Sequence, residues 1–219
     1  AFGASISYIE QEAPLGLAHA LLPAEDYLGQ APFVMYLGDN LLRNGLVDLV
    51  EAFRASEPEA LILLTQVKDP ESYGVAELDG ERVVRLVEKP KDPPSDLALV
   101  GVYMFGPEIF AAAKSIEPSA RGELEITDAI DALIDGGKRV EPHIVRGWWK
   151  DTGRLEDMLE ANRLVLEDLD ERTLSAARVQ AHFTAAGSGG GGNQPPTAVA
   201  SGSPTSGTVP LTVNFVGSG

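Results

Sequence analysis

The sequence predicts an α/β protein in which a mostly parallel sheet is covered by helices on both faces. Over the first 178 residues, short apolar runs alternate with segments in which apolar residues recur at helical spacing. The turn sequence Asp79-Gly80 separates two strand-like segments and predicts a hairpin inserted into this pattern. Arg178 is the last charged residue, so an uncharged tail follows the α/β part.

Seven segments have the apolar and β-branched composition of strands. The run at residues 97–105 is almost continuously apolar, which is typical of a strand buried on both faces. The expected strands are residues 5–9, 33–37, 61–64, 73–78, 82–87, 97–105 and 140–145.

Helical spacing predicts four helices. The first covers residues 15–28 and contains Pro23, at which we expect a kink. The second covers residues 46–55. Thr127 and Thr152 are expected to cap the last two, of which the former ends at Gly136-Gly137 and the latter extends to about Leu169.

The tail divides into a Gly/Ser-rich linker over residues 179–192 and two short β segments over residues 193–219. Residues 193–219 resemble the opening of a PKD (polycystic kidney disease) repeat, an immunoglobulin-like module of secreted and cell-surface proteins. The alternative is a disordered linker end. We expect the tail not to pack on the α/β part. At most, residues 197–200 and 211–215 would pair as a hairpin or add to an exposed sheet edge.

Composition excludes several classes of protein. The net charge is −16 and no segment concentrates Lys or Arg, which disfavours nucleic-acid and acidic-lipid partners. There is no cysteine, so no disulfide or thiolate metal site is possible. No apolar run reaches the ~18 residues of a membrane span, and the first residues do not resemble a signal peptide, so a cytoplasmic protein is expected. A genuine PKD-like tail would instead indicate an extracellular one.

Two aspartates stand where strand-like segments end. Asp39 follows the run at residues 33–37, and Asp151 follows Trp148-Trp149. Ligands of α/β sheets bind at such strand ends, and Mg²⁺ is held by one or two carboxylates plus phosphate oxygens. The alternatives are a turn aspartate that caps the helix at residues 46–55 and a carboxylate that complements the dipole of the last helix.

Further candidates flank these aspartates. In Glu88-Lys89, the lysine suits a phosphate and the glutamate suits sugar hydroxyls, although a solvated ion pair is the alternative. Glycine beside tyrosine in Tyr73-Gly74 and Gly101-Val102-Tyr103 indicates close ligand approach or core packing. Gln11 and Gly16 stand at a helix entry where an amide can hydrogen-bond a nucleobase. The three histidines have no metal-ligand spacing and receive no role.

Seven segments occur together in one order and resemble the sugar-1-phosphate nucleotidyltransferases, above all the glucose-1-phosphate thymidylyltransferases. The resemblance covers residues 2–169. Its segments are Tyr8-Ile9-Glu10-Gln11 with Leu15-Gly16-Leu17-Ala18, Leu37-Gly38-Asp39-Asn40, Tyr73-Gly74-Val75, Val87-Glu88-Lys89-Pro90, Val100-Gly101-Val102-Tyr103, Arg121-Gly122-Glu123-Leu124-Glu125-Ile126-Thr127-Asp128 and Trp149-Lys150-Asp151-Thr152-Gly153.

The resemblance implies a Rossmann-like sheet with a hairpin-containing sugar-binding subdomain. It also implies transfer of a nucleotidyl group from a nucleoside triphosphate, with dTTP expected, to glucose 1-phosphate, releasing pyrophosphate. Asp39 and Asp151 would bind Mg²⁺, and Lys89 would hold the sugar phosphate. The remaining substrate-binding positions would be Gln11, Gly16, Asn40, Tyr73, Gly74, Glu88, Gly101 and Trp149. Intact relatives would form homo-oligomers.

The chain departs from the family at both ends. Relatives of the long form continue into a parallel β-helix, whereas this chain runs into linker. The family's triphosphate-binding loop, of the form Gly-Gly-x-Gly-x-Arg-x-x-Pro, has no match in these 219 residues. We therefore expect residues 1–178 to be a catalytic domain that begins after this loop, with little activity by itself. The alternatives are an inactive fragment or fusion product and, from the tail, an extracellular interaction module.

Overall fold

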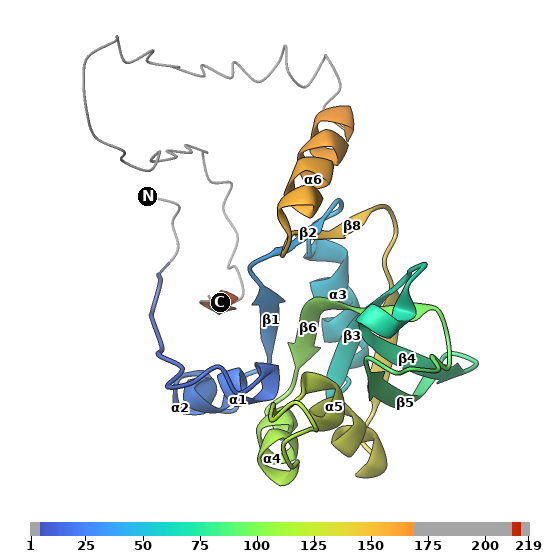
Figure 1. Ribbon diagram of the computed structural model, residues 1–219. Coiled ribbons are helices and arrows are strands. Elements are labelled where there is room, and N and C mark those ends of the chain that lie inside the picture. Colours follow the sequence, from blue (N-terminus) through green and yellow to red (C-terminus); the bar gives the residue numbers. More distant parts are fainter. Residues whose placement is uncertain (1–4, 169–211, 216–219) are drawn as a thin grey trace.

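The computed structural model describes residues 5–168 and 212–215, which form a sheet covered by helices (Figure 1). The α/β class is confirmed, but the sheet is not mostly parallel: of its six strand pairs, four are antiparallel and two are parallel. The main sheet is mixed, and its seven strands are β1 (Phe33–Leu37), β3 (Ala60–Gln66), β4 (Gly74–Asp79), β5 (Arg82–Glu88), β6 (Leu97–Phe105), β7 (Val140–Ile144) and β9 (Thr212–Phe215).

The centre of this sheet is β6, which is antiparallel to each of its three neighbours. It pairs with β1, β3 and β4, whereas β3–β7 and β1–β9 are parallel pairs. Eight of its nine residues are buried, as its continuous apolar sequence predicts. The central strand therefore connects both halves of the sheet.

Helices cover both faces of the sheet, as expected. One apolar core contains Leu21 of α1 (Leu17–Leu21), Phe110 of α4 (Glu108–Ser115) and Ile130 of α5 (Ile126–Asp135). The opposite core contains Leu49 of α3 (Val47–Ser56) packed with Val102 of β6. The helix α4 was not among the predicted elements.

A second, two-stranded sheet lies at one end of the first. Its strands are β2 (Asn40–Leu42) and β8 (Trp149–Asp151), which are antiparallel and pair Asn40 with Asp151. Neither strand was predicted, because three residues are too few to show an alternating pattern. This small sheet joins the ends of two segments that are distant in sequence.

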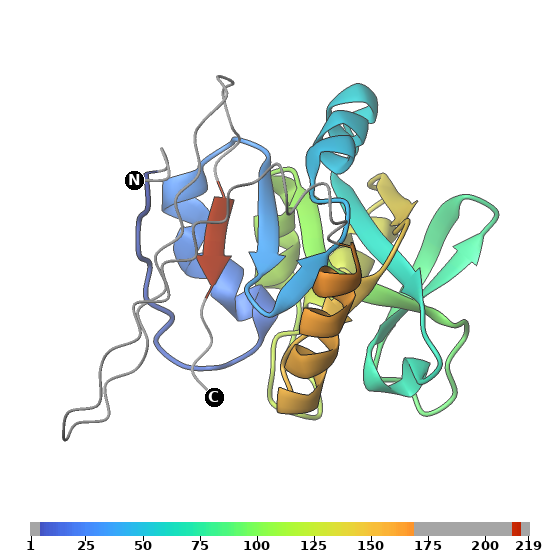
Figure 2. The same cartoon turned by 90° about the horizontal axis from the view of Figure 1, so that it is seen from above.

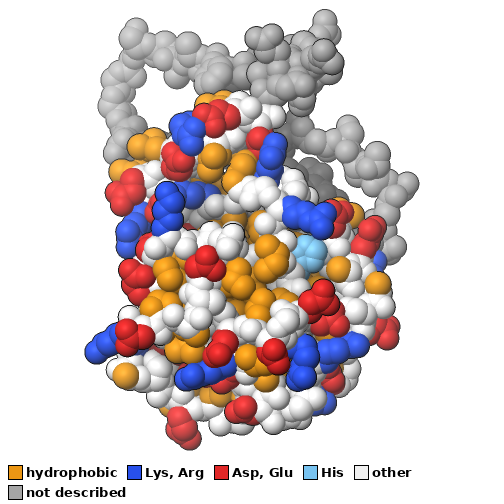
Figure 3. Space-filling view, turned by 90° about the vertical axis from the view of Figure 1, so that its right-hand side faces the viewer, with side chains coloured by type: hydrophobic (Ala, Val, Ile, Leu, Met, Phe, Trp, Pro, Cys, Tyr) orange, Lys and Arg blue, Asp and Glu red, His pale blue; other side chains and the backbone are white. Residues whose placement is uncertain are grey.

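The predicted hairpin is confirmed as β4 and β5. Gly80 adopts φ +62°, the left-handed conformation that glycine tolerates best in a tight turn. On the face that carries this hairpin, acidic and basic side chains surround a group of apolar ones (Figure 3). A cavity of about 820 Å³ lies between the hairpin and β7 and is lined by Leu78, Val83 and Ile144 among others.

Two expectations about the first part of the chain need correction. Residues 5–9 form no strand, and Ile6 and Tyr8 are 69% and 93% exposed. The expected helix at residues 15–28 is divided into α1, a 3₁₀ turn η1 (Leu22–Ala24) and α2 (Glu25–Leu28). The division falls at Pro23, because proline cannot donate a backbone hydrogen bond inside a helix.

The two predicted threonine caps are wrong. The helix α5 begins after Glu125, and the Thr127 hydroxyl donates to the Glu88 carboxylate at 3.2 Å instead. The helix α6 begins at Leu155, and the Thr152 hydroxyl donates to the backbone oxygen of Asp39 at 2.8 Å. Both hydroxyls therefore connect distant segments rather than ending a helix.

The helix α6 (Leu155–Asp168) confirms the predicted helical spacing but does not bury its apolar residues. Only Ala161 is buried, while Leu155, Leu159 and Leu166 are 66–76% exposed. Of the helices in the described part of the chain, none is long and apolar enough to cross a membrane.

For the tail, the sequence predicted at most a hairpin or addition to an exposed sheet edge, and β9 is the part of the tail that the structure describes. Residues 212–215 pair in parallel with β1, and Figure 2 shows the two strands side by side. This matches the lesser alternative, addition to a sheet edge. The predicted linker, the PKD-like resemblance and the partner segment at residues 197–200 lie outside the described residues.

Candidate functional site

Asp39 and Asp151 lie together at the end of β1. The backbone N–H and the hydroxyl of Thr152 both donate to the backbone oxygen of Asp39, each at 2.8 Å. A Cβ placed on Gly153 would lie 3.2 Å from Oδ1 of Asp151 and 3.8 Å from Oδ2 of Asp39, so these two oxygens are at most about 7 Å apart. Because β2 separates Asp39 from α3, and Asp151 lies in β8, neither aspartate caps a helix.

One oxygen of each carboxylate accepts a hydrogen bond from the protein. Oδ1 of Asp39 accepts from the Asn40 amide at 2.9 Å, and Oδ1 of Asp151 accepts from the Gly153 N–H at 2.8 Å. Within residues 5–168, no hydrogen bond or ion pair engages the Oδ2 atom of either aspartate. Two oriented carboxylates with free oxygens fit Mg²⁺, which takes one or two protein ligands and fills its other positions with water and phosphate. The described residues contain no cluster of three or more potential metal ligands, so phosphate and water would complete the coordination.

Asn40 holds this end of the sheet together. Its side chain is buried, and its Oδ1 accepts from the Gly101 N–H at 3.0 Å and from Nε1 of Trp149 at 2.6 Å. Its Nδ2 donates to Asp39. The Tyr36 hydroxyl donates to its backbone oxygen at 2.9 Å. Through this one amide, Asn40 links β6, β8 and the candidate metal site. It therefore positions Trp149 and Asp39.

Gln11, Gly16 and Asp39 line one cavity of about 650 Å³. Nε2 of Gln11 donates to the backbone oxygen of Gly16 at 3.3 Å and to Nδ1 of His19 at 3.0 Å. These contacts fix the orientation of the amide beside the cavity. His19, for which the sequence suggested no role, therefore helps to hold Gln11 at the cavity wall.

Three glycines predicted to admit a ligand are required by packing. A Cβ on Gly16, which has φ +103°, would lie 2.4 Å from the backbone oxygen of Leu124. A Cβ on Gly101 would lie 2.6 Å from Nδ2 of Asn40, and one on Gly74 would lie 2.6 Å from the Thr127 methyl group. Close approach occurs at all three positions, but the neighbour in each case is the protein itself.

Glu88 belongs to a cluster that the sequence did not reveal. Its carboxylate accepts from Thr127, and Arg121 lies 3.4 Å away. Arg121 also bonds the buried Glu125 at 2.8 Å and pairs with Glu123, which lines the 650 Å³ cavity. This cluster thus connects the predicted sugar site with the cavity. The sequence signal for this cluster is the segment at residues 121–128, in which one arginine is followed by three acidic residues.

Burial raises the pKa of Glu88 above its ordinary value of 4.5, and Glu125 raises it further, while Arg121, Lys89 and Thr127 oppose the shift. The folded protein therefore holds this proton more tightly than the unfolded chain does. The neutral carboxyl group of Glu88 therefore stabilises the folded protein below pH 4.5. This contribution declines as the pH rises through the raised pKa.

We expect Glu88→Gln to reduce this decline, because glutamine does not titrate. The melting temperature should fall less between pH 4.5 and 7 in the variant than in the parent protein. Glu81→Gln, in the exposed turn of the same hairpin, is the matched control. Identical pH profiles for Glu88→Gln and the parent would contradict the prediction.

Tyr73 and Trp149 form the aromatic part of the site. Their ring centroids are 5.7 Å apart in an edge-to-face arrangement, and burial raises the pKa of Tyr73. Trp149 is oriented by its bond to Asn40. The two rings therefore connect the start of β4 with the β8 strand that carries Asp151.

Lys89 directly follows β5 and is exposed. It has φ +39°, which is unusual for a residue other than glycine, and its N–H donates to the backbone oxygen of Tyr73 at 3.0 Å. Held backbone strain of this kind often accompanies functional positions. No ion pair in the described part of the chain engages its ammonium group.

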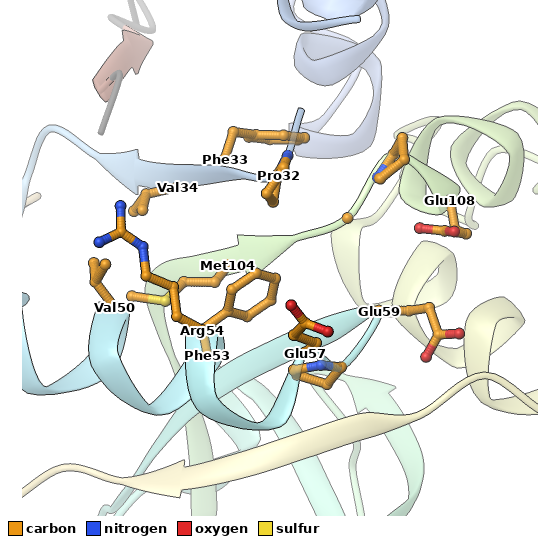
Figure 4. A pocket seen from close by; sticks show the side chains of 13 residues that line it. Pro32, Phe33, Val34, Val50, Phe53, Arg54, Glu57, Glu59, Met104 and Glu108 are labelled. Atoms are coloured by element: carbon orange, nitrogen blue, oxygen red, sulfur yellow. The ribbon is translucent and has the colours of Figure 1, made fainter. Parts of the chain in front are cut away.

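A separate hollow of about 420 Å³ lies away from the aspartates, at the start of β1 (Figure 4). Its apolar side chains include Phe33, Phe53 and Met104, and its rim carries Arg54 and Glu108. None of the predicted site residues lines it. The candidate site is therefore the cavity at the other end of β1.

Comparison with known proteins identifies the family to which this fold belongs. The family model described as "Nucleotidyl transferase" matches residues 1–168, so the chain belongs to that family. This confirms the resemblance and the Rossmann-like α/β fold.

Three similar proteins carry related names. A glucose-1-phosphate thymidylyltransferase of Streptomyces antibioticus is 60% identical over 173 residues, which are 78% of this chain and 49% of that protein. A low-salt glycan biosynthesis nucleotidyltransferase of Haloferax volcanii is 54% identical over 76% of this chain and 47% of that protein. A UDP-glucose pyrophosphorylase solved with UDP-glucose is 28% identical, with a TM-score of 0.67 over 74% of this chain and 66% of that one. The chain spans about half the length of the curated relatives it matches.

Proposed function

We propose that this chain supplies the metal site and the sugar-phosphate site of a nucleotidyl transfer from dTTP to glucose 1-phosphate. The observation that carries the proposal is the convergence of Asp39 and Asp151 around Gly153. The names of the relatives support glucose 1-phosphate as acceptor and a thymidine nucleotide as donor. A bound Mg²⁺ would neutralise charge on the phosphates and orient them.

The other predicted site residues would each bind one part of the substrates. Gln11 and the cavity wall at Gly16 would hold the nucleobase, because the amide oxygen of Gln11 can accept from a pyrimidine N–H while its Nε2 is held by Gly16 and His19. Glu88, held by Thr127 and Arg121, would accept hydrogen bonds from sugar hydroxyls. Lys89 would hold the sugar phosphate, whose oxygen attacks the α-phosphorus while pyrophosphate leaves. Such transfer depends on position and charge rather than on a covalent intermediate.

Isothermal titration with glucose 1-phosphate, with and without Mg²⁺, tests this function directly. We expect binding that Mg²⁺ strengthens, together with slow pyrophosphate release from dTTP, because these 219 residues contain no Gly-Gly-x-Gly-x-Arg-x-x-Pro segment. Failure of the sugar phosphate to bind under either condition would refute the proposal. Release near ~10 s⁻¹ would show that other residues replace that loop.

Lys89→Ala is expected to raise the Kd for glucose 1-phosphate about tenfold, because it removes one exposed charge contact to phosphate. The rate at saturating substrate should change little, since the contact is made equally before and during the reaction. Lys91→Ala, two residues further on and also exposed, is the control. Equal effects of the two variants would show that Lys89 acts only through general charge.

A further inference from the structure

The cavity of about 820 Å³ between the β4–β5 hairpin and β7, here called the hairpin cavity, has no part in the proposed reaction. It lies between β5 and β7, two edge strands that no hydrogen-bond ladder joins in the described residues. None of the predicted site residues lines it. Glu88 lies at the opposite end of β5 from Arg82, about 20 Å away along the extended strand. The hairpin cavity is therefore separate from the candidate site, and its volume is in the range of small-molecule sites.

Local features of the chain keep this cavity open. The pairing of β4 with β5 shifts its register between Glu77 and Leu78, and an irregularity of this kind increases the twist of a hairpin. Gly80 and Gly137 line the cavity at two turns, with φ +62° and +72°. A Cβ on either glycine would meet no atom within 4 Å. At these two turns no side chain obstructs the cavity.

The inner surface of the hairpin cavity is apolar. Val83 and Val140 line it and also belong to the main apolar core, in which they are 4% and 7% exposed. Ile144, which lines it from β7, is 47% exposed. Removal of such surface from water favours the binding of an apolar group.

The charged side chains around the cavity differ in balance from the rest of the chain. Three basic residues and two acidic ones line it, whereas the whole chain has 17 basic and 33 acidic residues. Arg139 pairs with Glu141, and Lys138 lies 3.8 Å from Glu59. Arg82 is exposed, and within residues 5–168 no hydrogen bond or ion pair engages its guanidinium group. Its donors are therefore available to an anion.

We propose that the hairpin cavity binds a small apolar molecule that carries one anionic group. The apolar part contacts Val83, Val140 and Ile144, and the anionic group accepts hydrogen bonds from Arg82. The size and apolar surface of the cavity define the body of the ligand, and the free guanidinium defines its charge. This inference does not depend on which reaction the site at Asp39 and Asp151 performs.

Isothermal titration of the full-length chain with decanoate, decanol and decylammonium tests the proposal. The three probes share one chain length and differ in the charge of the head group, and each is used below its micelle-forming concentration. We expect decanoate to bind most tightly and decylammonium least. Saturating glucose 1-phosphate should leave the Kd for decanoate unchanged. Absence of decanoate binding, equal or tighter binding of decylammonium, or competition with glucose 1-phosphate would overturn the proposal.

Two arginines of β5 provide a matched pair of variants. Arg82→Ala should raise the Kd for decanoate about tenfold and leave that for decanol unchanged, because it removes one charge-assisted contact. Arg85→Ala is the control, since Arg85 is exposed on the same strand but does not line the cavity. Equal effects of the two variants would overturn the proposal.

The position of the bound probe is tested separately. Ile144→Trp should weaken the binding of both decanoate and decanol at least tenfold, because the larger side chain fills the cavity from its exposed side. In the parent protein, decanoate should shift the amide resonances of residues 78–83 and 134–144. Shifts confined to the hollow at the start of β1 would overturn the proposal, and this measurement decides it even if Ile144→Trp does not fold.

Discussion

Asp39→Asn and Asp151→Asn are each expected to remove the Mg²⁺-dependent part of glucose 1-phosphate binding and to slow pyrophosphate release about 100- to 1000-fold. The substitution keeps the shape of the side chain but removes the charge that a hard cation requires. Titration at several Mg²⁺ concentrations, followed by a pyrophosphate-release assay, gives both quantities.

The same variants should fold normally, which separates a functional from a structural role. Asp39 is exposed and Asp151 is half-buried, and asparagine can still accept the bonds that Asn40 and Gly153 donate. The free energy of unfolding should therefore change by no more than about 0.5 kcal/mol. Asp48→Asn, an exposed carboxylate on α3, is the control. Small and equal changes in binding for all three variants would mean that Asp39 and Asp151 are ordinary surface charges.

Asn40→Ala is expected to be the most destabilising change at the site, by about 2–3 kcal/mol. It leaves the buried Gly101 N–H and the Trp149 Nε1–H without their acceptor, and a buried donor without a partner loses its full solvation energy. For a domain of this size, the melting temperature should fall by about 8 °C. Thermal unfolding followed by circular dichroism measures the change.

Asn44→Ala is the matched control, because Asn44 is exposed and its amide makes one bond, to the backbone oxygen of Arg146. Asn40→Asp provides a second comparison: it keeps an acceptor for Gly101 but places another carboxylate beside Asp39. It should recover part of the stability and still weaken Mg²⁺-dependent binding. An Asn40→Ala protein as stable as the Asn44→Ala protein would contradict the proposed linking role.

Local patterns predicted the long elements of the fold well. The strand at residues 97–105 and the hairpin at Asp79-Gly80 were found because each is specified by neighbouring residues: a continuous apolar run and a turn that demands positive φ. The same logic failed for residues 5–9, which pair with no strand in the described part of the chain.

The candidate site was predicted less completely, because most of its contacts join distant segments. Thr127 and Thr152 resemble helix caps by sequence, but each hydroxyl meets a group contributed by another part of the chain. Likewise, no local signal shows that Arg121 lies beside Glu88, or that Asn40 receives a hydrogen bond from Trp149. Sequence order identified candidate residues, whereas their partners depend on the completed sheet.

The pairing of β1 with β9 has a consequence for how the protein is made. A ribosome adds about 5–20 residues each second, so β1 would wait roughly 10 s or more after its own synthesis before residues 212–215 emerge. Throughout that interval the outer edge of a strongly apolar strand would be open to other nascent chains and to chaperones. The strand β6, which pairs with the other side of β1, is synthesised much earlier. Emergence of residues 212–215, rather than synthesis of the α/β part, would therefore mark the moment at which this edge of β1 is paired.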